Sequence, residues 1–105
     1  MYLINSPILP NYGVFRLSGE ISLAKARAMV RVGFESAIGH EATAVLLSQL
    51  LGVDVPEIRQ RVQLLVGEKA LVFRVKQRLP EGCIIQDIDE LSRIPYEFSL
   101  LERIE

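Results

Sequence analysis

The chain has 105 residues, of which 50% are apolar and 24% charged, the balance of a globular protein with one core and therefore one domain, residues 1–105. Its net charge of −1 gives no electrostatic basis for non-specific binding to duplex DNA. A single cysteine, Cys83, excludes an internal disulfide, and with only one histidine beside it a zinc site is disfavoured. No apolar run is long enough to span a membrane. We therefore expect a cytoplasmic protein without metal or other cofactor.

The amino-terminal residues predict two strands separated by a loop. Residues 1–5, MYLIN, are mostly apolar and begin the first predicted strand. Residues 6–13 contain two prolines, an asparagine and a glycine, which is typical of a loop. Residues 14–18, VFRLS, alternate apolar and polar side chains as a half-buried strand does.

Two helices are predicted next. Ser22 is placed to cap a helix over residues 21–31, and residues 33–39 form a short extended connection to a second helix, residues 40–51, which Gly52 ends. The apolar stripe of the first helix is Leu23, Ala26, Met29 and Val30. That of the second is Thr43, Ala44, Leu46, Leu47, Leu50 and Leu51.

The carboxyl-terminal half predicts further strands. Residues 59–66 and 69–77 form two strands joined at Gly67, and residues 78–82 form a turn. A short helix over 87–94 has acidic residues in its first turn.

A last strand follows at residues 96–104, where apolar and polar side chains alternate. The predicted order is β-β-α-α-β-β-α-β. We therefore expect an α+β fold in which a mixed, about five-stranded sheet has helices on at least one face.

Basic residues concentrate in one part of the sequence. Such charges usually form a solvated face, whereas a local anion-binding site is the more specific interpretation. The residues are Arg59, Arg61, Lys69, Arg74, Lys76 and Arg78.

The single histidine, His40, stands at the start of the second predicted helix. Gly39 gives the backbone freedom to turn into that helix, and the free N–H groups of the next three residues, among them Thr43, can receive an anion. An imidazole beside a bound phosphate can move a proton during phosphodiester cleavage. The other interpretation is an ordinary surface histidine, and Glu41 competes for the same helix dipole.

A second candidate cluster is the stretch KQRLPEG. Pro80 and Gly82 define a tight turn that holds Arg78 and Glu81 three residues apart. The arginine could bind phosphate, and the carboxylate could orient or deprotonate a ribose hydroxyl. The alternative is a solvated ion pair worth under about 1 kcal/mol.

Several stretches together resemble one known family. YLIN, SAIGHEAT, LLGVDVP, QRLPEG and YEFSLLERI follow one another in the order and spacing of small viral, phage and plasmid proteins that include the anti-CRISPR ring nucleases acting against type III immunity. The similarity covers nearly the whole chain. It implies a homodimer that holds cyclic tetra-adenylate across its two-fold axis and cuts it without metal.

The resemblance also implies roles for individual residues. His40 matches the catalytic histidine that protonates the departing 5′ oxygen, and Glu81 matches the glutamate that positions the attacking ribose 2′-hydroxyl. Arg78 matches an arginine that holds phosphate and stabilises the developing charge.

Ligand-binding roles are implied for four more positions. Arg59 also matches an arginine that holds the phosphates and stabilises the developing charge, Asn5 would line the pocket, and Gly39 and Thr43 belong to the motif around the histidine. The chain departs from the family in its proline-rich loop after Asn5 and in Arg74, which stands where a neutral amide is expected.

The function expected from the resemblance is a nuclease that converts cyclic tetra-adenylate to linear di-adenylate ending in a 2′,3′-cyclic phosphate. Two alternatives are a homodimeric module that binds and sequesters the cyclic nucleotide without cutting it, and a viral protein that uses the same fold to interact with a host protein.

Overall fold

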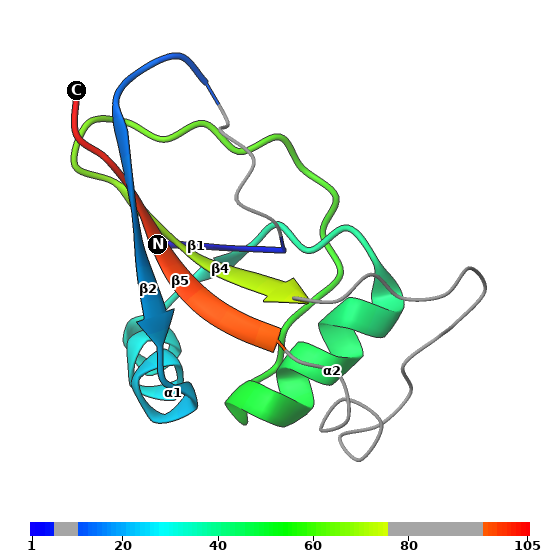
Figure 1. Cartoon of the computed structure of the whole chain (residues 1–105). Coiled ribbons are helices and arrows are strands. Elements are labelled where there is room, and N and C mark those ends of the chain that lie inside the picture. Colours follow the sequence, from blue (N-terminus) through cyan, green and yellow to red (C-terminus); the bar gives the residue numbers. More distant parts are fainter. Residues whose placement is uncertain (6–10, 76–95) are drawn as a thin grey trace.

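The computed structural model describes residues 1–5, 11–75 and 96–105 (Figure 1). These residues form one mixed sheet and two helices. In chain order the elements are β1 (Tyr2–Ile4), β2 (Phe15–Ile21), α1 (Leu23–Val32), β3 (Glu35–Ser36), α2 (Glu41–Leu51), β4 (Lys69–Val75) and β5 (Tyr96–Arg103).

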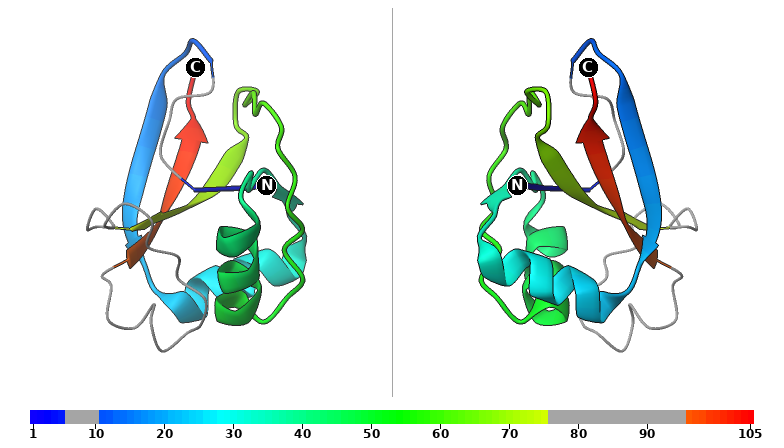
Figure 2. Two further views of the ribbon diagram at one scale, coloured as in Figure 1. Left: turned by 90° about the vertical axis from the view of Figure 1, so that its right-hand side faces the viewer. Right: turned by 90° about the vertical axis from the view of Figure 1, so that its left-hand side faces the viewer.

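The five strands lie in the order β2-β5-β4-β1-β3. β1 is parallel to both of its neighbours, β3 and β4, whereas β5 is antiparallel to β2 and β4. Both helices lie on the same face of the sheet (Figure 2). The predicted α+β fold with a mixed five-stranded sheet is confirmed.

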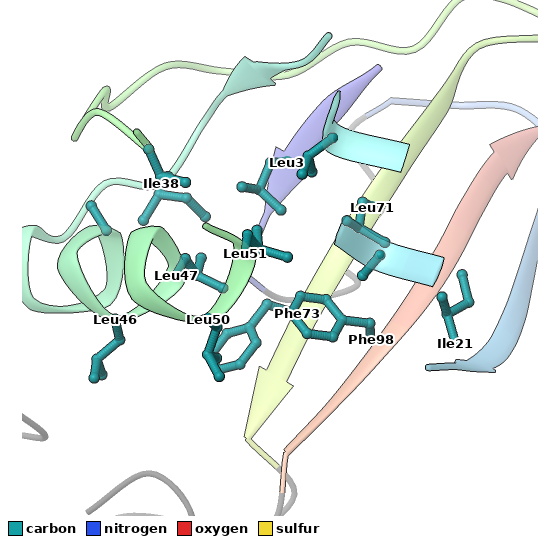
Figure 3. Close-up of a cluster of buried hydrophobic side chains, with 14 residues drawn as sticks. Leu3, Ile21, Ile38, Leu46, Leu47, Leu50, Leu51, Leu71, Phe73 and Phe98 are labelled. Atoms are coloured by element: carbon teal, nitrogen blue, oxygen red, sulfur yellow. The ribbon is translucent and has the colours of Figure 1, made fainter. Parts of the chain in front are cut away.

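The main core lies between the helices and one face of the sheet (Figure 3). Strand β4 shows how the faces are divided, because its side chains alternate: Leu71 and Phe73 belong to this helix-side core, and Ala70 and Val72 point to the opposite face. We call the buried cluster on that opposite face the loop-side core. It consists of Ile4, Leu64, Ala70, Val72 and Leu101.

The predicted caps at the start of α1 and at the end of α2 are both observed. The Ser22 hydroxyl accepts a hydrogen bond from the Lys25 N–H at 3.1 Å, which caps α1. Gly52 ends α2 in the left-handed conformation, with φ 71° and ψ 23°, and its N–H donates to the Ser48 carbonyl. Ala26 and Val30 of α1 are buried, so the predicted apolar stripe does face the core.

The predicted strand over residues 59–66 is wrong, because this stretch is irregular and joins no strand of the sheet. Its alternating pattern has another cause: Leu64 belongs to the loop-side core and Val62 packs against it, whereas Arg61, Gln63 and Leu65 are exposed. The fifth strand is instead β3, inside the predicted connection 33–39.

Strand β2 continues beyond the predicted residues 14–18 as far as Ile21. The predicted turn at 78–82 and helix at 87–94 lie outside the described residues. No helix in the described part of the chain is long and apolar enough to cross a membrane.

Candidate functional site

The parallel strands bring several predicted site residues to one side of the molecule. β1, β3 and β4 run in the same direction, so their carboxyl ends meet at the same edge of the sheet. Half-buried Asn5 directly follows β1, and residues 37–40 lead from β3 into α2. The amino end of α2 lies on that same side (Figure 1). Open α/β sheets commonly bind ligands at such an edge.

His40 is the N-cap residue of α2. Its backbone is extended, with φ −131° and ψ 129°, and its carbonyl accepts the first helical hydrogen bond from the Ala44 N–H at 3.0 Å. The imidazole makes no capping hydrogen bond and the residue is exposed. The side chain is therefore open to a ligand at the helix end, where backbone N–H groups favour an anion. Half-buried Thr43 lies in the first turn.

Arg59 lies against Gly39. A Cβ atom placed on Gly39 would be 3.6 Å from the Arg59 Nε and 3.7 Å from the Cβ and Cγ of the same side chain. Two residues predicted to bind ligand, twenty positions apart in the sequence, are thus in contact next to His40. The expected conformational role of Gly39 is wrong, because its φ lies outside the left-handed region. A side chain here would instead add bulk beside the guanidinium.

Ser36 connects the two chain segments that meet at this point. Its hydroxyl donates to the Pro56 carbonyl at 2.7 Å and accepts from the Ile38 N–H at 3.3 Å. Ser36 is only 2% exposed, so its hydroxyl is shielded from water, and the bond from the Ile38 N–H is buried. The residue links the end of β3 to the irregular segment that carries Arg59.

The two neighbours of Arg59 are also hydrogen-bonded to the β3–α2 connection. The Ile58 N–H donates to the Ile38 carbonyl at 2.9 Å, and the Gln60 side-chain amide donates to the Ser36 carbonyl at 2.6 Å. The backbone on both sides of Arg59 is therefore held, and its side chain is directed along Gly39. Ser36 and Gln60 were not identified from the sequence, because nothing in their local pattern marks a polar residue that forms such distant bonds.

Two of the described basic residues of this cluster are paired with carboxylates. Lys69 and Arg74 lie at opposite ends of β4, and each pairs with a carboxylate of β5: Lys69 with Glu102 at 3.7 Å, and Arg74 with Glu97. For these two residues the solvated, ion-paired interpretation holds. Arg59 alone among the described members of the cluster lies against Gly39 beside His40.

The remaining predicted catalytic residues, Arg78 and Glu81, lie outside the described residues, as does Lys76. Within 1–5, 11–75 and 96–105, no group of three or more histidine, cysteine, aspartate or glutamate residues is arranged to hold a metal ion.

Comparison with known proteins gives a consistent match over most of the chain. The sequence profile of the family described as STIV B116-like matches residues 1–98. The uncharacterized protein ORF117 of Acidianus two-tailed virus is 35% identical over 111 residues, covering 100% of this chain and 94% of that protein. The uncharacterized protein 26 of Sulfolobus islandicus filamentous virus is 34% identical, covering 97% of this chain and 90% of that protein.

A bacterial protein and a solved structure are also similar to this chain. The uncharacterized protein YddF of Bacillus subtilis is 33% identical over 72 residues, covering 69% of this chain and 66% of that protein. Among solved structures, B116 of Sulfolobus turreted icosahedral virus superposes with a TM-score of 0.76 over 97% of both chains, at 21% identity. This last likeness concerns the fold.

Proposed function

The chain belongs to the STIV B116-like family, and from this premise we propose that it is a metal-independent ring nuclease that cleaves cyclic tetra-adenylate and so switches off type III CRISPR signalling. One observation carries the proposal: Arg59 lies against Gly39, directly beside an exposed histidine at the amino end of α2. The two relatives that match almost the whole chain are viral, which agrees with a role against a host defence.

The helix end and Arg59 supply the binding part of the site. Backbone N–H groups in the first turn of α2 and the positive end of the helix dipole favour a phosphate. The Arg59 guanidinium adds charge-assisted hydrogen bonds from the side of Gly39. Asn5, at the end of the adjacent parallel strand β1, adds an amide that can bind the nucleotide.

The reaction needs little from the protein, because RNA carries its own nucleophile. The ribose 2′ oxygen attacks the adjacent phosphorus, the bond from phosphorus to the 5′ oxygen breaks, and a 2′,3′-cyclic phosphate forms. His40 donates a proton to the departing 5′ oxygen, which contributes about 10²–10⁴-fold to the rate. By the family resemblance, Glu81 orients the ribose and Arg78 stabilises the charge on the phosphate, and the Glu81 carboxylate is the group that can accept the hydroxyl proton.

A homodimer suits this substrate. A ring of four equivalent nucleotides has two-fold symmetry, and an isologous dimer presents the same residues from each subunit to opposite sides of the ring. Each His40 would then act on one of two opposite phosphates, and the product would be linear di-adenylate.

The experiment is incubation of the purified protein with cyclic tetra-adenylate in EDTA, followed by separation of the products. Wild type is expected to yield linear di-adenylate with a cyclic phosphate end. His40→Ala should keep its affinity for the ring and lose cleavage by about 100-fold or more. Absence of cleavage by excess wild-type protein contradicts the proposal, and tight binding without turnover would indicate a sequestering module instead.

The binding role of Arg59 is tested separately. Arg59→Ala should weaken the affinity for the ring by roughly 10- to 100-fold, the loss expected for hydrogen bonds to a charged group. Arg61→Ala is the matched control, because Arg61 is an exposed arginine two positions further along the same segment. Equal affinities of the two variants would remove Arg59 from the site.

A further inference from the structure

Strand β2 is an edge of the sheet. It pairs with β5 on its inner side, and no strand of the described residues pairs with its outer side (Figure 1, Figure 2). Natural edge strands usually carry prolines, lysines or bulges that prevent pairing with another chain. The strand FRLSGEI has neither proline nor lysine, and its register is regular from Phe15 to Gly19 and shifts only between Gly19 and Ile21.

The hydrogen bonds at the start of β2 indicate which residues face the open side. The N–H of Val14 donates to the Glu105 carbonyl at 3.0 Å, and its carbonyl accepts from the Ile104 N–H at 2.7 Å. Val14 therefore faces β5. Since successive residues of an antiparallel strand alternate between the two sides, Phe15, Leu17 and Gly19 direct their backbone N–H and C=O groups outward.

Exposed apolar side chains accompany this open edge. Tyr12 is 99% exposed, and Val14 and Leu17 are each 52% exposed, all within six residues of chain at or just before β2. Val14 and Leu17 are three residues apart and project to opposite faces of the strand, so each face carries an exposed apolar side chain beside the unpaired backbone groups, as on a strand that binds another strand.

We infer that β2 pairs with β2 of a second copy of this chain, antiparallel, with the two-fold axis passing at Leu17. In this register Leu17 of each copy lies opposite the other, and Phe15 lies opposite Gly19, where the ring covers a position without a side chain. Arg16, which forms an ion pair with Glu102 of its own chain at 3.8 Å, lies opposite the small polar Ser18 of the second copy. The regular part of the strand is thus complementary to itself.

This pairing is independent of the proposed nuclease site. Strands β5 and β4 separate β2 from β1, which places the two strands about 14 Å apart across the sheet. Pairing at β2 therefore leaves the amino end of α2 accessible. If the nuclease is itself dimeric, the edge adds one further step of assembly.

Disulfide formation tests the register, in a background in which Cys83→Ser removes the native thiol. Leu17→Cys should form a disulfide-linked dimer rapidly, because directly opposite residues have Cα atoms about 5.5 Å apart, within disulfide range. Arg16→Cys should not, because its two copies are offset diagonally by about 7–8 Å. Val32→Cys, on an exposed residue of α1, measures random collision. Equal cross-linking of all three variants overturns the inference.

Sedimentation gives a readout without new thiols. Leu17→Lys places two like charges opposite each other and should weaken the association step about tenfold or more, so wild type should reach twice the mass of the variant. Val32→Lys is the control and should behave as wild type. A wild-type mass that Leu17→Lys leaves unchanged, including a monomer at every concentration, overturns the inference. Cleavage of cyclic tetra-adenylate by Leu17→Lys should equal that of wild type, so a failure of one proposal is distinguishable from a failure of the other.

Discussion

The link between Ser36 and the segment carrying Arg59 leads to a quantitative prediction. Ser36→Ala removes a hydroxyl that donates to the Pro56 carbonyl and accepts from the Ile38 N–H. Each bond contributes about 1 kcal/mol, and the Ile38 N–H, left buried without its partner, adds its desolvation cost. We expect the free energy of unfolding to fall by about 2–3 kcal/mol, which corresponds to a decrease in Tm of roughly 10–20 °C for a domain of this size.

The measurement is urea denaturation followed by circular dichroism, with the midpoint expected to fall and the slope to stay unchanged. Ser18→Ala is the matched control, because Ser18 is exposed and its loss should change stability by no more than about 0.5 kcal/mol. Affinity for cyclic tetra-adenylate should fall only in Ser36→Ala, since Arg59 loses its support. Equal stability of the two variants would refute the role given to Ser36.

Three further predictions concern single substitutions. Gly39→Ala should change the free energy of unfolding by less than about 0.5 kcal/mol, because the new Cβ meets only ordinary contacts. Gly52→Ala should lower it by about 1–2 kcal/mol, because the φ of Gly52 is +71°, and chemical denaturation of both variants measures the difference. Leu47→Ala, in the fully buried part of α2, should cost about 2–5 kcal/mol and show an earlier thermal transition. The carboxylate of Glu35 raises the pKa of the Tyr2 hydroxyl, so Glu35→Gln should lower that pKa toward its ordinary value, measured by the ultraviolet absorbance of the phenolate, and an unchanged titration would contradict this.

Local signals predicted α1 and α2 well. The hydroxyl of Ser22 caps α1, and the left-handed conformation at the end of α2 needs a glycine, so each boundary depends on residues within one turn of it. The apolar stripes face the core for the same reason, because a period of 3.6 residues defines one side of a helix.

Strand assignment failed where alternation had a cause other than a sheet. Residues 59–66 alternate because Val62 and Leu64 reach the loop-side core, although the backbone pairs with no strand. β3 is only two residues long, and its place in the sheet comes from pairing with β1. A strand's partner lies far away in the sequence, so a pattern within the strand cannot identify it.

The sequence by itself determined that His40 lies at the start of α2, because an apolar helix pattern follows it directly, and helix ends form from adjacent residues. Only the tertiary structure decided that Arg59 lies against Gly39, since the hydrogen bonds of Ser36, Ile58 and Gln60 that hold it join segments about twenty residues apart. Those bonds require the position that pairing with β1 gives to β3, and their contribution depends on burial that no local stretch of sequence can provide.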